Sequence, residues 1–253
     1  MNYVGDVRSC SWSPDGQRFL AADGSGLAMY NARTGNKDLE IEGNEIVRSC
    51  SWSPDGQRFL AAGGFGLAMY NARTGNKDLA IKDAGFVLSC SWSPDGKRLL
   101  AAGKSGLAMY NAQTGNKDLA IKDAGFVFSC SWSPDGQRVL AGGWRVLAIY
   151  NAQTGNKDLE IKDAGYVRSC SWSPDGQQWL LGSKGQLQIR NAQAAPYEII
   201  REFLLVEDSE VVWEPQTGRI NSVSGEAWRD FYWERTLPNG TRQRLPFEAL
   251  YST

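Results

Sequence analysis

The sequence Ser9-Cys10-Ser11-Trp12-Ser13-Pro14-Asp15-Gly16 occurs five times in this chain, and successive copies begin 40 residues apart. Each copy carries one cysteine and one tryptophan: Cys10, Cys50, Cys90, Cys130 and Cys170, with Trp12, Trp52, Trp92, Trp132 and Trp172. Self-similarity at a fixed period of this length is typical of solenoids, propellers and repeat arrays. The repeat by itself therefore predicts a repeat architecture, independently of any single motif.

Within the first repeat, the pattern of side chains predicts four short strands. Residues 7–12 alternate small and β-forming side chains without a helical stripe, which indicates a strand. Ser13-Pro14-Asp15-Gly16 has the composition of a tight turn. Further strands are predicted at residues 18–22, 27–30 and 38–41, separated by glycine-containing breaks. Four short strands in about 40 residues predict one blade of a β-propeller.

The repeat unit resembles the WD repeat, and bacterial members of that family in particular. The resemblance rests on the Ser-Trp-Ser-Pro-Asp-Gly turn and on Asn31-Ala32-Arg33-Thr34-Gly35-Asn36-Lys37, and it covers residues 4 to 200. It implies an all-β propeller of four-stranded antiparallel blades that serves as a sensor or scaffold. The Gly-His pair of the family is absent, so its polar network between histidine and tryptophan cannot form. The Trp-Asp pair is replaced by Tyr30-Asn31, Tyr70-Asn71, Tyr110-Asn111, Tyr150-Asn151 and Arg190-Asn191.

The tail is predicted to be a diverged sixth blade. Residues 211–215 imitate the repeated turn, and Trp213 lies 41 residues after Trp172. Strands are expected at residues 211–213, 220–223, 229–233 and 244–250. The run at residues 225–229 also resembles the terminal segment of propellers fused to bacterial signalling ATPases and caspase-like proteins. The predicted single propeller, residues 1–253, consists of repeats 4–43, 44–83, 84–123, 124–163 and 164–204 and a closing blade 205–253. The alternative is five blades with a C-terminal β appendage.

Composition narrows the functional classes. The net charge is −1, from 27 basic and 28 acidic residues, which argues against a general polyanion-binding surface and a nucleic-acid partner. No apolar run of about 18 residues predicts a membrane span, and residues 1–6 lack the pattern of a signal peptide. We therefore expect a cytoplasmic protein with no membrane partner. The five cysteines are expected to be buried apolar side chains.

Catalytic and metal-binding patterns are absent from the sequence. The chain has no histidine and no CxxC motif, so the common zinc spacings and histidine-based triads are excluded. The glycines of Gly63-Gly64-Phe65-Gly66 are not followed by a helical pattern, so a turn between strands is expected instead of a phosphate loop. The aspartates of the repeated turn are spread around a ring and cannot converge as paired carboxylates. We expect no enzyme activity, no cofactor and no metal.

The repeats differ mainly in two connections, which lie at the same end of an antiparallel blade. One set of positions precedes and enters the first strand: Asp6, Ile46, Phe86, Phe126 and Tyr166, then Arg8, Arg48, Leu88, Phe128 and Arg168. The other set joins the second and third strands: Asp23-Gly24-Ser25, Gly63-Gly64-Phe65, Gly103-Lys104-Ser105, Gly143-Trp144-Arg145 and Ser183-Lys184-Gly185. The turns at the opposite end scarcely vary.

Aromatic and arginine side chains dominate binding hot spots, so the variation predicts a recognition surface for a protein or peptide. The expected partner-binding residues are Arg48, Phe65, Phe86, Phe126, Phe128, Trp144, Arg145, Tyr166 and Arg168. Three other interpretations are open. The loops could have drifted without selection, the phenylalanines could be core residues, or the surface could bind a glycan or small molecule as a lectin does.

Overall fold

The structure is a computed structural model that describes residues 7–42, 46–183 and 186–192, and the backbone of further strands between residues 199 and 246. It divides into two units, Met1–Gly176 and Gln177–Thr253. Of the predicted features, those at Asp6, Lys184-Gly185, residues 194–197 and the tail segments 215–218, 225–229, 238–240 and 247–250 lie outside the described residues. Each unit is described by itself.

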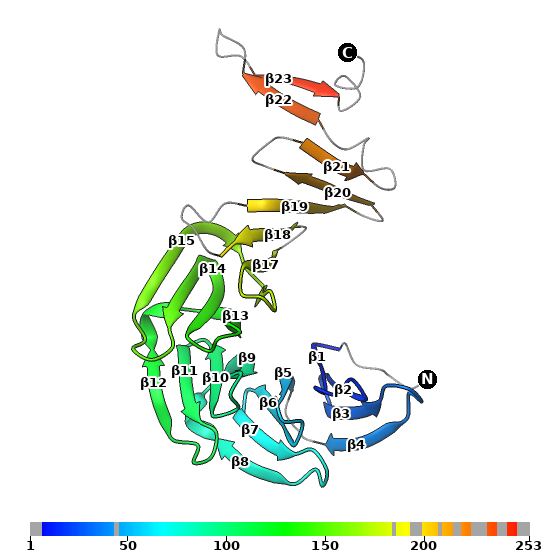
Figure 1. Ribbon diagram of the computed structural model, residues 1–253, viewed down its shortest axis with the longest axis vertical. Coiled ribbons are helices and arrows are strands. Elements are labelled where there is room, and N and C mark those ends of the chain that lie inside the picture. Colours follow the sequence, from blue (N-terminus) through cyan, green and yellow to red (C-terminus); the bar gives the residue numbers. More distant parts are fainter. Residues whose placement is uncertain are drawn as a thin grey trace. The chain divides into compact units, whose positions relative to one another are not determined.

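The first unit is built from antiparallel sheets in which strands adjacent in sequence are adjacent in space (Figure 1). The first three sheets are blades of four strands each, and the fourth has three strands because β14 covers the positions of two. Their strands are β1 (Ser9–Trp12), β2 (Arg18–Ala22), β3 (Gly26–Asn31) and β4 (Lys37–Glu42); β5 (Val47–Trp52), β6 (Arg58–Gly63), β7 (Gly66–Asn71) and β8 (Lys77–Ile81); β9 (Val87–Trp92), β10 (Arg98–Gly103), β11 (Gly106–Asn111) and β12 (Lys117–Ile121); and β13 (Val127–Trp132), β14 (Arg138–Asn151) and β15 (Lys157–Tyr166). Two short 3₁₀ turns, η1 (Lys82–Ala84) and η2 (Lys122–Ala124), follow β8 and β12, and β16 (Ser169–Trp172) ends the unit. These sheets confirm the all-β fold of four-stranded antiparallel blades.

Aromatic side chains fix the register within a blade. In the second blade Trp52 pairs with Phe59 across β5 and β6, and Phe59 pairs with Tyr70 across β6 and β7. The rings of Phe59 and Tyr70 are stacked with centroids 5.5 Å apart. Cross-strand aromatic pairs of this kind contribute up to about 1 kcal/mol each to a sheet. Tyr70, which occupies the place of the family's tryptophan, therefore fills a packing role within the sheet.

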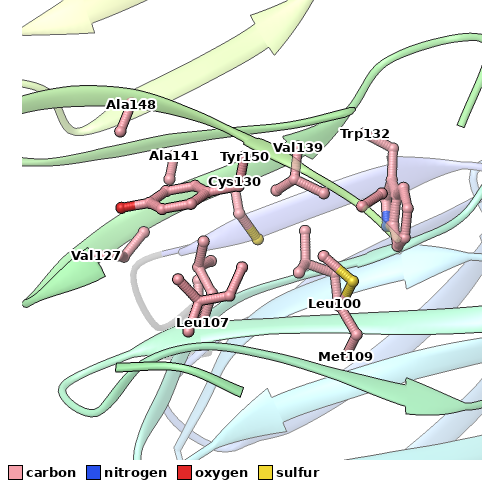
Figure 2. Packing of buried hydrophobic residues seen from close by; sticks show 13 residues of the cluster. Leu100, Leu107, Met109, Val127, Cys130, Trp132, Val139, Ala141, Ala148 and Tyr150 are labelled. Carbon is pink, nitrogen blue, oxygen red and sulfur yellow. The ribbon is translucent and has the colours of Figure 1, made fainter. Parts of the chain in front are cut away.

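The hydrophobic core lies between consecutive blades. The third blade contributes Leu100, Leu107 and Met109 from one of its faces. The fourth blade meets them with aromatic, sulfur and small side chains, which Figure 2 shows opposite: Val127, Cys130, Trp132, Val139, Ala141, Ala148 and Tyr150. The same two kinds of face meet between the first and second and between the second and third blades. Each blade thus presents one aliphatic face and one face rich in aromatic and small residues.

Serine side chains tie the innermost strands of successive blades together. Ser9 Oγ accepts a hydrogen bond from the Cys50 N–H at 3.1 Å, and Ser49 Oγ accepts one from the Cys90 N–H at 3.1 Å. Equivalent bonds join Cys130 N–H to Ser89 Oγ at 3.2 Å and Cys170 N–H to Ser129 Oγ at 3.0 Å. The strands β1, β5, β9, β13 and β16, which begin the repeats, lie beside one another in that order. These bonds satisfy backbone donors that sheet pairing leaves free.

The repeated turn closes on its own side chains. Ser93 Oγ donates a hydrogen bond of 2.6 Å to Asp95 and accepts one of 2.9 Å from the Arg98 N–H. The bond from Ser93 holds the pKa of Asp95 below its ordinary value. At the next turn Asn111 Oδ1 accepts hydrogen bonds from the backbone N–H groups of Gln113 and Thr114. Asparagine here performs the local capping for which a short polar side chain is suited.

In the second unit, the described strands are β17 (Gln178–Ser183), β18 (Gln186–Asn191), β19 (Ile199–Val206), β20 (Ser209–Glu214), β21 (Arg219–Val223), β22 (Tyr232–Thr236) and β23 (Arg242–Pro246). Consecutive members of β17 to β21 are hydrogen-bonded neighbours in one sheet, whereas β22 and β23 pair separately. The pairing of β20 with β21 includes Trp213 opposite Ile220. Strands thus occur near each predicted position of the tail, and the count of six blades stays a prediction.

The expectation that all five cysteines are buried is wrong for one of them. Cys50, Cys90, Cys130 and Cys170 are buried, but Cys10 is exposed, as is Trp12 beside it. Cys50, Cys90 and Cys130 pack against the blade that precedes their own, whereas no strand precedes β1 among the described residues of the first unit. Loss of solvation raises the pKa of the Cys50 and Cys90 thiols to about 12 and that of Cys170 to about 11, and it raises that of Cys130 further.

Thiol labelling tests this difference. In the native protein a thiol reagent at mildly alkaline pH should modify Cys10 and leave the other four cysteines unmodified, because only the thiolate of an accessible cysteine reacts. Protection of Cys10 as well would indicate that a further blade covers β1, as a closed ring of six blades requires. All five should react after denaturation. A Cys10→Ser variant should lose the native reaction altogether. Rapid native labelling of several cysteines in that variant would contradict the packing of the innermost strands.

Substitution of an inter-blade serine should destabilise the protein. Ser89→Ala leaves the Cys130 N–H without its acceptor, and an unsatisfied buried donor costs about 1–3 kcal/mol. The free energy of unfolding in urea measures the loss. Ser105→Ala, an exposed serine of the variable connections, is the control and should stay within about 0.5 kcal/mol of the parent. Equal stabilities for the two variants would show that the serine bonds do not hold the blades together.

Candidate recognition surface

The two variable connections meet at one end of each blade, which we call the variable end. The residue that begins the first strand pairs with the glycine that ends the second: Val47 with Gly63, Val87 with Gly103, and Val127 with Gly143. The residues just before the first strand therefore lie beside the connection between the second and third strands. The opposite end, with the Ser-Pro-Asp-Gly and Thr-Gly-Asn turns, is called the invariant end.

Two cations contact one aromatic ring at the variable end of the second and third blades. The guanidinium carbon of Arg48 lies 4.9 Å from the centroid of Phe86, and Nζ of Lys104 lies 4.7 Å from the same centroid. Arg48 and Phe86 are half-buried, and Lys104 is exposed. Arg48 is the second residue of β5, Phe86 precedes β9 and Lys104 follows β10. Residues of two adjacent repeats therefore form this group.

Four aromatic side chains form a continuous cluster at the variable end of the fourth blade. The centroids of Phe126 and Phe128 are 4.8 Å apart, those of Phe128 and Tyr166 are 4.6 Å apart, and those of Tyr166 and Trp144 are 5.6 Å apart. Arg168 lies over the Tyr166 ring at 5.0 Å. Trp144 is 64 % exposed and Phe126 is 41 % exposed. We call Phe126, Phe128, Trp144 and Tyr166 the aromatic cluster.

Tyr166 joins the cluster at a place where the fourth blade differs from the second and third blades in the opposite strand. In the second and third blades Gly66 and Gly106 have φ values of 99° and 96°. A Cβ on Gly106 would lie 2.3 Å from the Ile121 carbonyl oxygen, which lies at the start of η2. The fourth blade has Val146 at this place, and the same sequence Lys-Asp-Ala-Gly at residues 162–165 continues as strand β15. Val146 pairs with Lys162, and Trp144 pairs with Tyr166.

The remaining predicted residues have different environments. Phe65 is half-buried and packs against the core between the first and second blades. The side chain of Arg145 lies outside the described residues. Phe86 and Phe128 are half-buried and Phe126 is exposed, so the interpretation as core residues at the strand mouth does not hold for Phe126. The structure brings seven predicted residues into the two groups: Arg48, Phe86, Phe126, Phe128, Trp144, Tyr166 and Arg168.

The sequence reasoning missed one residue of the variable end and a groove at the invariant end. The sequence showed Lys104 only as part of a variable connection. Its contact with Phe86 follows because the two variable connections lie at the same end of the blade. The groove, of about 410 Å³, lies between the second and third blades, and its lining includes Arg58, Trp92 and Asp95. Its walls come from the turns that are alike in every repeat. Because these turns do not vary, comparison of the repeats could not identify the groove.

The requirement for glycine at the start of the third strand can be tested by substitution. Gly106→Val should destabilise the protein by about 2 kcal/mol or more, because a left-handed conformation is costly for a residue with a Cβ and the Ile121 carbonyl occupies the space. Urea unfolding measures the loss. Gly64→Ala, which meets only Phe86 at 4.0 Å, is the control and should change stability by less than about 0.5 kcal/mol. A Gly106→Val variant as stable as the parent would contradict the role assigned to this glycine.

Comparison with known proteins bears on the repeats directly. A family model described as WD domain, G-beta repeat matches residues 2–28, 36–66, 79–109 and 119–151. A comparison with curated protein sequences gives no match. The matched segments fall in the first four predicted repeats, where the structure has its stacked antiparallel sheets. On these grounds the chain belongs to the WD-repeat family.

Proposed function

We propose that this chain is a non-enzymatic recognition or scaffold propeller that binds a protein or peptide partner through the variable end of its blades. WD-repeat proteins generally mediate protein–protein interactions or act as scaffolds. The proposal includes the single propeller of residues 1–253, with six blades, and a cytoplasmic location in a bacterium. In the part of the chain that the structure describes, no helix has the length and apolar character needed to cross a membrane.

The observation that carries the proposal is the exposed part of the aromatic cluster. A tryptophan that is 64 % exposed and a phenylalanine that is 41 % exposed lie on the same cluster, beside Arg168. Interfaces are enriched in tryptophan, tyrosine, phenylalanine and arginine, and a few such residues supply most of the binding energy. The half-buried members, Phe128 and Tyr166, contact the exposed members, so the surface is ordered before a partner binds.

The distribution of these residues favours a protein partner over a glycan. A lectin-like propeller would carry a pocket at matching positions of each blade. Here the equivalents of Trp144 in the second and third blades are Gly64 and Lys104, and the cluster is confined to the variable end of the fourth blade. A patch that differs from blade to blade fits one extended partner surface, because such a partner needs no internal symmetry.

The decisive experiment compares two tryptophans of equal exposure. Trp144 is 64 % exposed at the variable end, and Trp12 is 63 % exposed on β1. Partners captured from the source cell by the intact protein are identified, and their affinities for Trp144→Ala and Trp12→Ala are then measured. Trp144→Ala should lose about 2 kcal/mol of binding, roughly thirtyfold in Kd, because it removes an anchor.

Melting temperatures separate binding from folding in these variants. Trp144→Ala should change stability little, since substitutions of exposed residues stay within about 0.5 kcal/mol. Binding lost with Trp144→Ala and kept with Trp12→Ala supports the proposal. Partners that bind both variants as tightly as the parent would place recognition elsewhere, and affinity for a glycan array that depends on Trp144 would favour the lectin-like alternative.

A further inference from the structure

Three cations at the variable end have no acidic partner among the described residues. Arg48, Lys104 and Arg168 each lie over an aromatic ring, at 4.9, 4.7 and 5.0 Å from its centroid. No carboxylate of the described residues comes within ion-pair distance of their nitrogen atoms. Contact with a ring face orients a cation while leaving its remaining donors free for another group.

The arginines that begin the second strands behave differently. Arg18, Arg58 and Arg138 lie 3.6 to 4.0 Å from Asp38, Asp78 and Asp158 respectively. Arg98, at the equivalent position of the third blade, donates a hydrogen bond to the Ala152 carbonyl at 2.6 Å. The arginines at this recurring position are thus satisfied within the protein. Arg48, Lys104 and Arg168 occupy variable positions and lie over aromatic rings instead.

The unsatisfied cations and the exposed aromatic side chains share one surface. Phe86 precedes β9 and Phe126 precedes β13, and these two strands pack side by side. The Arg48–Phe86–Lys104 group therefore adjoins the aromatic cluster, and Arg168 contacts that cluster directly at Tyr166. A partner that covers this surface meets apolar ring faces flanked by positive charge.

We propose that the partner of this surface is an acidic peptide segment with one or more large apolar side chains. This inference rests on the proposed function and specifies its ligand. Carboxylates of the peptide bind the free donors of Arg48, Lys104 and Arg168, and an apolar side chain packs on Trp144 and Phe126. Bonds between a guanidinium or ammonium group and a carboxylate are stronger than neutral ones, and complementary charge also raises the rate of association.

Single-stranded nucleic acid also binds surfaces that combine cations with aromatic rings, but the charges here favour a peptide. Tracking a phosphate backbone needs a groove of many cations. On this chain the cations over aromatic rings at the variable end are Arg48, Lys104 and Arg168, too few to track a phosphate backbone, and the net charge is −1. A cationic ligand, such as a methylated lysine in an aromatic cage, would be repelled by the three free cations.

The test selects ligands from a random dodecapeptide library on the immobilised full-length protein. Selected peptides are measured against the parent, against Trp144→Ala and against the triple variant Arg48→Glu, Lys104→Glu, Arg168→Glu. The matched control is Arg33→Glu, Arg73→Glu, Lys97→Glu, which makes the same change of charge at exposed residues of the invariant end. Fluorescein-labelled oligo(U) and oligo(dT) are titrated alongside.

We expect selected peptides with an excess of aspartate and glutamate and with at least one aromatic or aliphatic residue. Their affinity should fall about tenfold or more in Trp144→Ala and in the variable-end triple variant, and should stay near the parent value in the control. Neutral or basic peptides that depend on Trp144 would overturn the acidic ligand and leave the proposed function standing. Peptides indifferent to Trp144 would overturn both, whereas no selected peptides at all would overturn the peptide ligand and leave the proposed function to the capture experiment. Oligonucleotide binding that the variable-end triple variant abolishes would replace the peptide with a nucleic acid.

Discussion

The hydrogen bond between a serine hydroxyl of one repeat and a cysteine N–H of the next is the interaction on which the stacking of blades depends. The innermost strands of neighbouring blades do not pair as a sheet, so the Cys50, Cys90, Cys130 and Cys170 N–H groups need another acceptor. The serine one repeat earlier supplies it at 3.0 to 3.2 Å. The family's histidine-centred network is missing here. Serine bonds between blades and stacked aromatic rings within blades take over its structural role.

Much of this fold could be predicted from one sequence because the repeats act as an internal comparison. Fixed period, turn composition and alternation placed the strands, and antiparallel pairing placed both variable connections at one end. The exposure of Cys10 could not be read in that way, because a periodic pattern treats every copy alike, whereas β1 alone has no preceding strand among the described residues of the first unit. Half-burial of Phe65 was also hidden, since a loop position gives no sign of the core beneath it.

The fourth blade shows where local sequence stops determining local structure. Lys-Asp-Ala forms η1 and η2 after the second and third blades but continues as strand β15 in the fourth. Across the ladder the third blade has Lys104, Ser105 and Gly106, whereas the fourth has Trp144, Arg145 and Val146. Contacts of the aromatic cluster follow from that change of register: Tyr166 pairs with Trp144 only because the strand continues. Comparison of the repeats therefore identified the variable positions, but it did not predict the contacts between them.

Some contacts at the variable end join successive repeats, whereas the blade faces are nearly the same in every repeat. Arg48 and Phe86 belong to successive repeats, as do Phe128 and Tyr166. Removal, addition or reordering of a whole repeat would preserve the stacking faces, since these are of the same two kinds at each described junction. It would also bring different variable residues into contact. A gene of this design can generate new binding surfaces by shuffling whole units, without point mutations in the core.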